Sequence, residues 1–166
     1  RETADLVKRL SGRRILVIGD MVADIYIDGR ISRISREAPV LVLEQAGKKI
    51  VAGGAANVAH NAQTLGGSVY AVGLLGEDAA AQGLADILAE KSVETAGLFR
   101  DAARPTISKT RIIAGGRATV SQQIVRLDKE SHAPLRRETE GEMLRYLDEI
   151  LPQMDGIVLS DYGAGT

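Results

Sequence analysis

The chain has 166 residues, 45% of them hydrophobic and 26% charged, which predicts one globular domain with a real core. The net charge of -1 gives no electrostatic basis for binding nucleic acid or an anionic membrane surface, so any anion site must be a local cluster. The lack of cysteine excludes disulfides and zinc–thiolate sites, and the lack of a long apolar run or a secretory signal indicates a cytoplasmic protein.

The first predicted elements are a short helix and a buried strand. Residues 1–10 carry apolar side chains on one helical face, and the continuous apolar run of residues 14–19 predicts a strand buried on both faces. Asp20 follows that strand at its carboxyl end, where open α/β sheets bind ligands, and Asp24 comes shortly after it. These aspartates fit either turn and cap roles or carboxylates that accept hydrogen bonds from sugar hydroxyls.

A glycine pair, Gly53-Gly54, opens the helix around which the sequence is organised, and we expect this helix to end at Gly66. Glycine lets the backbone approach a ligand closely, and the N–H groups of the first helical turn have no intrahelical partner. Asn57 lies in that turn, where its amide can donate and accept hydrogen bonds. The pattern therefore indicates either a binding loop or a simple strand-to-helix connection.

The next elements alternate strand and helix. Two short β-type runs at residues 25–28 and 40–44 come before the glycine pair. After the central helix, residues 68–75 predict a strand, and residues 79–90 predict a helix capped by Asp78. This order implies right-handed βαβ units, so the expected fold class is α/β with a mostly parallel central sheet flanked by helices.

Residues 106–114 and 118–127 flank a pair of glycines, which predicts a β-hairpin. Lys109 and Arg111 lie two residues apart in the first arm and so share a strand face, and Arg126 lies in the second arm. One interpretation is a charged, solvated edge ribbon. The other is a phosphate clamp, because guanidinium and ammonium groups bind phosphate oxygens.

The end of the chain predicts one more helix and one more strand. Residues 136–151 have an amphipathic helical pattern, and Pro152 prevents its extension. Residues 157–160 form an apolar run that ends at Asp161, again at the carboxyl end of an expected sheet strand.

Three strings of the sequence resemble a known family. The run AGGAANVA at residues 52–59, with its spacing to Gly66 and Gly76, resembles the first sequence pattern of the ribokinase-like (PfkB) carbohydrate kinases. RISREAP at residues 33–39 and TISKTRIIA at residues 106–114 are similar to bacterial heptose-7-phosphate kinase domains of the bifunctional enzymes of ADP-heptose synthesis. The resemblance implies a ribokinase-like fold with a small β-strand lid, of which this chain covers about the N-terminal half.

The resemblance also implies an activity. It implies transfer of a phosphoryl group from ATP, with Mg²⁺, to the anomeric hydroxyl of heptose 7-phosphate during synthesis of ADP-heptose for lipopolysaccharide core. It implies a homodimer paired through lid strands near residues 22–46 and 106–127, with no nucleic-acid or membrane partner. The residues that it assigns to substrate binding are Asp20, Asp24, Gly53, Gly54, Asn57, Lys109, Arg111, Arg126 and Asp161.

No catalytic or metal-binding residue is assigned. The family's G-A-G-D motif supplies the general base, and the only similar string, at residues 163–166, ends in threonine. We therefore expect the isolated chain not to turn over. The sequence also departs from the family at Ala164, where the family usually has lysine, so this position cannot supply a lysine contact to a ligand.

Two alternatives stay open. The chain is either part of another ribokinase-like kinase, for ribose, fructose or a keto-deoxy sugar, or a non-catalytic binding or dimerisation module on a split kinase fold. The strings at residues 33–39 and 106–114 favour the heptose-phosphate kinases over other sugar kinases.

Overall fold

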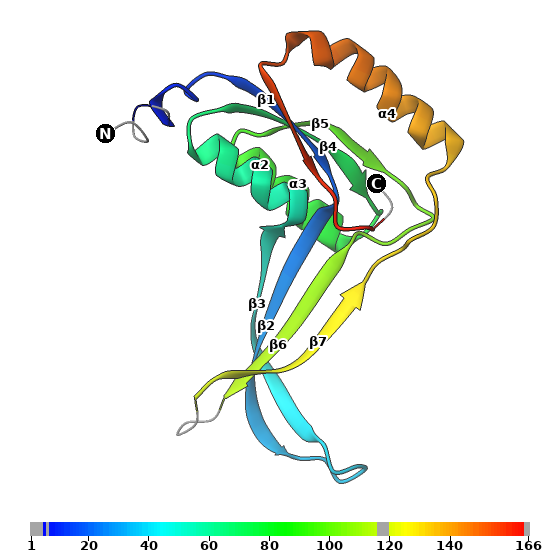
Figure 1. Cartoon of the computed structure of the whole chain (residues 1–166). Coiled ribbons are helices and arrows are strands. Elements are labelled where there is room, and N and C mark those ends of the chain that lie inside the picture. The colour runs from blue at the N-terminus through cyan, green and yellow to red at the C-terminus, as the bar shows by residue number, and fades with distance from the viewer. Residues whose placement is uncertain (1–4, 6, 116–119, 165–166) are drawn as a thin grey trace.

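Four parallel strands form the central sheet, and a second four-stranded sheet projects beyond the carboxyl end of its strand β1 (Figure 1). The computed structural model describes residue 5, residues 7–115 and residues 120–164. In the central sheet the strands follow the order β5-β4-β1-β8, and β1 pairs in parallel with both β4 and β8. The strands are β1 Arg14–Gly19, β4 Ser68–Leu75, β5 Glu94–Arg100 and β8 Gly156–Ser160.

Helices cover the two faces of this sheet, which gives three layers (Figure 1). On one face lie α2 (Gly54–Thr64) and α3 (Ala79–Glu90). On the other face lies α4 (Arg137–Ile150), which continues into the short helix η1 (Leu151–Gln153). None of the helices formed by the described residues has the length and apolar character needed to cross a bilayer.

The core explains why β1 carries an uninterrupted apolar run. Leu16 and Val17 are both fully buried although successive strand residues point to opposite faces. Val17 packs in the cluster that holds Leu84 of α3, while Leu16 packs in the cluster that holds Met143 of α4. The expected α/β fold with a parallel sheet between helices is therefore confirmed.

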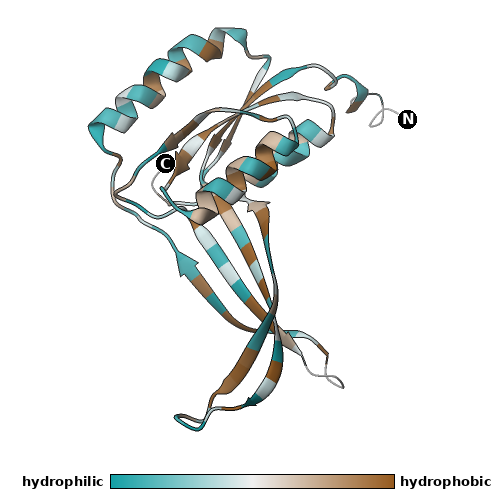
Figure 2. Ribbon diagram, turned by 180° about the vertical axis from the view of Figure 1, so that it is seen from behind, coloured by the Kyte–Doolittle hydropathy of each residue, from teal (hydrophilic) through white to brown (hydrophobic). Residues whose placement is uncertain are grey.

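The projecting sheet is built from two antiparallel hairpins joined by a parallel pair. Its order is β3-β2-β6-β7, with β2 antiparallel to β3, β6 antiparallel to β7, and β2 parallel to β6. Hydrophilic and hydrophobic residues alternate along these strands (Figure 2), as expected for strands with one wetter and one drier face. The strands are β2 Met21–Ile34, β3 Leu41–Gly53, β6 Ser108–Gly115 and β7 Gln122–Lys129.

The projecting strands are longer than the short runs expected at residues 25–28 and 40–44. Charged residues such as Arg30 and Lys48 sit within β2 and β3, and they mask the strand pattern in the sequence. The expected helix over residues 1–10 lies partly outside the described residues; Asp5 and Val7 within it are helical. The start of the expected second hairpin arm, up to residue 119, also lies outside the described residues.

Candidate functional site

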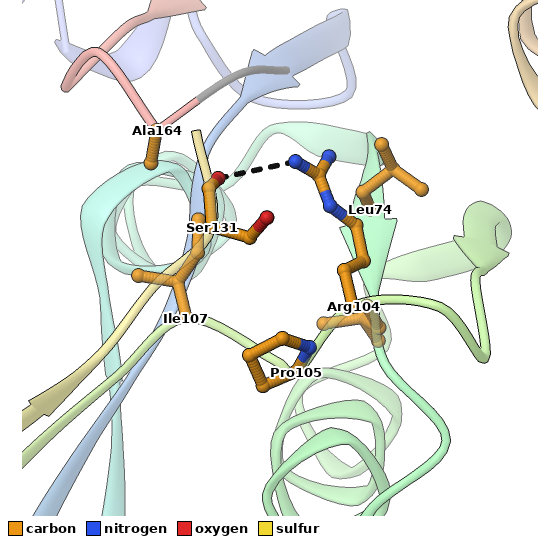
Figure 3. Close-up of a pocket in the computed structure, with 7 residues that line it drawn as sticks. Leu74, Arg104, Pro105, Ile107, Ser131 and Ala164 are labelled. Atoms are coloured by element: carbon orange, nitrogen blue, oxygen red, sulfur yellow. Dashed lines mark hydrogen bonds between the residues drawn. The ribbon is translucent and has the colours of Figure 1, made fainter. Parts of the chain in front are cut away.

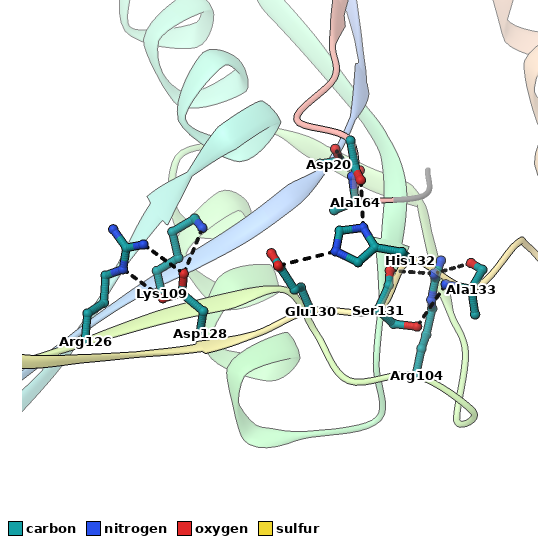
Figure 4. A network of polar contacts seen from close by, with 11 residues as sticks. Asp20, Arg104, Lys109, Arg126, Asp128, Glu130, Ser131, His132, Ala133 and Ala164 are labelled. Carbon is teal, nitrogen blue, oxygen red and sulfur yellow. Dashed lines mark hydrogen bonds and ion pairs between the residues drawn. The ribbon is translucent and has the colours of Figure 1, made fainter.

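Asp20 lies where β1, α2 and the segment after β8 meet. Asp20 is 1% exposed, and its Oδ2 accepts a hydrogen bond from the N–H group of Tyr162 at 2.7 Å. The same oxygen accepts from the N–H group of Ala164 at 3.2 Å (Figure 4). Its Oδ1 is buried and has no partner among the described residues. The backbone oxygen of Asp20 accepts from the N–H of Ala55 at 2.9 Å, which fixes the start of α2. Backbone groups therefore hold this carboxylate at the carboxyl end of β1.

Asp24 and Arg111 form an ion pair between β2 and β6 in the projecting sheet, with the guanidinium donating to Asp24 Oδ1. Both side chains are about one-fifth exposed, at 22% and 23%. The hydrogen bond to Asp24 is the main cause that raises the pKa of Arg111, so the guanidinium stays charged. A methyl group at Gly53 would overlap Asp24 Oδ2, so glycine at this position gives the carboxylate its space.

Tyr26 extends this cluster, and it was not among the predicted site residues. The guanidinium carbon of Arg111 lies 5.4 Å from the centre of the Tyr26 ring, and the Lys49 ammonium lies 5.6 Å from it. These distances fit cation–π contacts. The strand alternation in the sequence could have indicated Tyr26, because it lies two residues after Asp24 and so shares the same strand face.

Asp128 forms ion pairs with the other two predicted basic residues, Lys109 and Arg126 (Figure 4). Its Oδ1 lies 2.9 Å from Arg126 Nε, and its Oδ2 lies 3.4 Å from Lys109 Nζ. Loss of solvent works to raise the pKa of Asp128, but the hydrogen bond from Arg126 and the charge of Lys109 lower it more, so the net pKa is lowered. Asp128 therefore pairs with two of the cations of the predicted phosphate clamp, although it was not among the predicted site residues.

Strand register places these side chains on one face of the projecting sheet, which we call the charged face. Lys109 is directly opposite Asp24 on one side and Asp128 on the other. Arg111 is directly opposite Tyr26 and Arg126. Residues directly opposite in adjacent strands point to the same side, so the face carries paired cations and carboxylates beside an aromatic ring.

The other predicted site residues lie on the α/β body. Gly54 has a positive φ of 53°, a conformation that favours glycine, and the backbone oxygen of Asp20 lies where its Cβ would be. Asn57 is exposed on α2, where its Oδ1 accepts a weak contact from Asn61 at 3.4 Å. Asp161 is exposed and accepts from the N–H of Gly163 at 2.7 Å. Asp20 and Asp161 both line an open cavity of about 210 Å³.

A second, very small cavity lies beside Ala164, the position where lysine was expected (Figure 3). Its volume of about 10 Å³ holds at most one water molecule. Ala164 is 4% exposed and packs with Val22 and Ile107. Arg104 lines the same cavity and donates to the backbone oxygen of Ser131 at 3.1 Å. We assign this region a structural role.

The described residues contain no group of three or more histidine, cysteine or acidic side chains placed to hold a metal ion.

Sequence comparison identifies relatives of this chain. The profile of the pfkB family carbohydrate kinases matches residues 13–156. The bifunctional protein HldE of Helicobacter acinonychis (strain Sheeba) is 43% identical over 153 residues, which is 92% of this chain and 32% of that protein. The bifunctional protein HldE of Azorhizobium caulinodans is 47% identical over 152 residues, 91% of this chain and 31% of that protein. The chain thus spans about a third of the length of these curated relatives.

The fold also matches solved structures. A carbohydrate kinase from Agrobacterium tumefaciens superposes with a TM-score of 0.62 at 21% identity, covering 89% of this chain and 45% of that one. At this identity the match supports the fold.

Proposed function

Because this chain belongs to the pfkB family of carbohydrate kinases, we propose that it supplies the sugar-phosphate-binding part of a kinase. The proposed substrate is heptose 7-phosphate, and the proposed reaction is transfer of a phosphoryl group from ATP to its anomeric hydroxyl. The product would enter ADP-heptose synthesis for lipopolysaccharide core, in the cytoplasm.

The observation that carries the proposal is the Asp24–Arg111 pair beside Gly53, facing the same side as Lys109 and Arg126. An ionised carboxylate accepts strongly from sugar hydroxyls, and guanidinium groups bind phosphate oxygens through two donors. In the proposed arrangement Asp24 and Asn57 bind hydroxyls, the backbone at Gly53 and Gly54 approaches the sugar, and the cations of the charged face bind the 7-phosphate.

Two further predicted residues have supporting roles in this proposal. Asp20 is held by the N–H groups of Tyr162 and Ala164 and keeps one buried oxygen without a described partner, so it is oriented to accept one more hydrogen bond. Asp161 lies along the same cavity as Asp20 and offers a second carboxylate at this end of the sheet.

The choice of heptose 7-phosphate rests on sequence resemblance. The strings at residues 33–39 and 106–114 are similar to heptose-7-phosphate kinase domains, and the relatives at 43% and 47% identity are both bifunctional HldE proteins. ATP with Mg²⁺ is the proposed phosphoryl donor by family membership, and no residue of this chain is assigned to either. Since the sequence has no G-A-G-D motif for a general base, we expect this chain to bind substrate without turnover.

Calorimetric titration of the chain with heptose 7-phosphate, fructose 6-phosphate, ribose and ATP-Mg in parallel tests the proposal. We expect saturable binding of heptose 7-phosphate and its weakening in Arg111→Ala and Asn57→Ala. Arg145→Ala is the matched control, because Arg145 is exposed on α4, and this helix packs on the central sheet rather than on the projecting sheet. If the chain still unfolds cooperatively but binds no sugar, the proposal is contradicted. If it binds ribose or fructose 6-phosphate more tightly, that sugar takes the place of heptose 7-phosphate as the proposed substrate.

We also propose a homodimer that forms through the projecting sheet. Val125 and Leu127 of β7 are 41% and 55% exposed, and both lie on the face opposite Arg126. Apolar side chains in this position favour contact with another sheet. Sedimentation analysis should give a dimer for the wild-type chain and a monomer for Leu127→Lys.

A further inference from the structure

A cavity of about 320 Å³ lies between the projecting sheet and the start of α3, on the face of the sheet opposite the charged face. Ser108 and Lys129 form a directly opposed pair on β6 and β7, and both line the cavity. Lys109, the neighbour of Ser108, points to the charged face, so the two faces present different groups. Ile25 and Ile27 supply an apolar wall.

The first turn of α3 lines this cavity. The N–H groups of Ala79 and Ala80 donate to no described residue, and both residues line the cavity. The cap residue Asp78 is already engaged, because its Oδ1 accepts from Ala81 N at 2.9 Å and its Oδ2 accepts from Thr106 N at 3.0 Å. The helix therefore offers two unused donors at its positive end.

Ser108 supplies a second and independent indication of a ligand. Its side chain is buried, with 4% of the residue exposed, and it lines the cavity. Its hydroxyl has no hydrogen-bond partner among the described residues. Although the residue is almost fully buried, its hydroxyl is not among the buried unpaired atoms of the described residues, so the oxygen is accessible from the cavity that the residue lines. A hydroxyl in this position can donate to a ligand that enters the cavity.

Two lysines at the cavity carry positive charge that no carboxylate neutralises directly. Lys48 and Lys129 line the cavity, and neither forms a salt bridge within the described part of the chain. The positive charge of Lys129 contributes to the lowered pKa of Asp78, but it is the smallest of the causes, and the side chains of these two described residues form no salt bridge. By contrast, Lys109, Arg111 and Arg126 on the charged face all have carboxylate partners.

We propose that this cavity binds a phosphate group, either inorganic phosphate or the phosphate of a small ester, separately from the proposed sugar site. The two N–H groups of α3 and the Ser108 hydroxyl would donate to its oxygens, and Lys48 and Lys129 would neutralise its charge. Asp78 is a single negative charge against these two cations, and both of its oxygens are occupied. The apolar wall formed by Ile25 and Ile27 leaves space for the organic part of an ester.

The test is a titration of the ¹⁵N-labelled chain with inorganic phosphate, with chloride used to hold the ionic strength constant. We expect saturable shifts of the Ala79 and Ala80 amide signals. Lys129→Gln should weaken phosphate binding about tenfold, as expected for loss of one charge-assisted contact. Ser108→Ala should weaken it less, because it removes one neutral donor and preserves the fold of the strand.

Lys109→Gln is the matched control, because it removes a lysine from the opposite face of the same strand. Its affinity for phosphate at the Ala79 and Ala80 signals should match the wild type. Absence of saturable shifts at these signals would overturn the proposal, and so would an equal effect of Lys109→Gln and Lys129→Gln. Titration with glycerol 3-phosphate distinguishes the sources: tighter binding than inorganic phosphate indicates an ester, and equal binding indicates the free ion. Loss of heptose 7-phosphate binding would leave this result unaffected.

Discussion

Arg111 and Asp24 pair although 87 positions separate them in the chain. Strand β6 lies parallel to β2, and the register sets Arg111 beside Tyr26, two residue pairs further along than Asp24. The guanidinium therefore reaches diagonally to the carboxylate while its plane stays near the Tyr26 ring. The pair holds both groups in place before any ligand arrives, which lowers the entropic cost of binding.

The first prediction concerns this pair. Asp24→Asn keeps the shape of the side chain but removes its charge, so heptose 7-phosphate binding should weaken by about 10- to 100-fold, the cost of one charge-assisted hydrogen bond. Arg111→Lys should also weaken binding, because lysine lacks the two-donor fork. Calorimetry of both single variants and the double variant measures this. Losses that simply add would contradict a coupled pair, since residues in contact should be non-additive.

The second prediction concerns the space beside Asp24. Gly53→Ala should displace Asp24, because the new methyl group would overlap Asp24 Oδ2, and it should reduce both sugar-phosphate affinity and thermal stability. Gly141→Ala in α4 is the matched control, because a Cβ there meets no atom within 4 Å. That control should raise stability by about 0.5–1 kcal/mol through helix propensity. If the two variants have equal melting temperatures and equal affinities, Gly53 is not needed to leave space for the Asp24 carboxylate.

The third prediction concerns Asp128, which neutralises Lys109 and Arg126. Asp128→Asn should free both cations and strengthen phosphate binding at the charged face, and the binding should become more sensitive to salt. The pKa of Asp128 is lowered, so the wild-type carboxylate stays ionised at neutral pH and the effect should persist there. Titration with heptose 7-phosphate at two salt concentrations checks this. Weaker binding in the variant would instead mean that Asp128 orients the cations rather than screening them.

The fourth prediction concerns the cap of α3. Asp78→Ala should lower stability by about 0.5–2 kcal/mol, the usual cost of losing an N-cap. Burial works to raise the pKa of Asp78, but the N–H groups of Ala81 and Thr106 outweigh it, so the folded-state pKa is below the usual 3.8. A lowered folded pKa means that the carboxylate stabilises the fold above pH 3.8 and that this contribution is lost as the pH falls below it.

Thermal unfolding as a function of pH measures this difference. The gap in melting temperature between wild type and Asp78→Ala should be constant near neutral pH and should close in acid. Asp148→Ala is the control, because Asp148 is exposed on α4 and accepts no hydrogen bond from the described residues. A gap that stays constant down to the acid transition would show that the charge of Asp78 has no part in the cap.

The α/β body was predictable because its elements carry dense local signals. The apolar run of β1, the Asp78 cap and the glycine pair before α2 each place an element within a residue or two. The projecting strands gave weaker signals, because half of their residues face water and include charges at Arg30 and Lys49. Hydrophobic periodicity follows burial, so it underestimates the length of strands whose burial fades toward their outer ends, as in β2.

The candidate site was predictable as a set of residues but not as a set of contacts. Alternation placed Lys109 and Arg111 on one face, yet the sequence could not show that Arg111 pairs with Asp24 or that Asp128 lies between Lys109 and Arg126. The first pairing depends on the parallel register of β2 and β6, and the second depends on the antiparallel register of β6 and β7. No local pattern in the sequence encodes either register. The site assignments themselves stay predictions until binding is measured.

The parallel contact between β2 and β6 also sets an order for folding. The β2–β3 and β6–β7 hairpins are local and should form within microseconds, but neither is stable alone. The two hairpins join only when β6 pairs with β2, and α2, β4, α3 and β5 lie between the hairpins in the chain. We therefore expect the α/β body to form first and the projecting sheet to assemble last, as a separate slow kinetic phase.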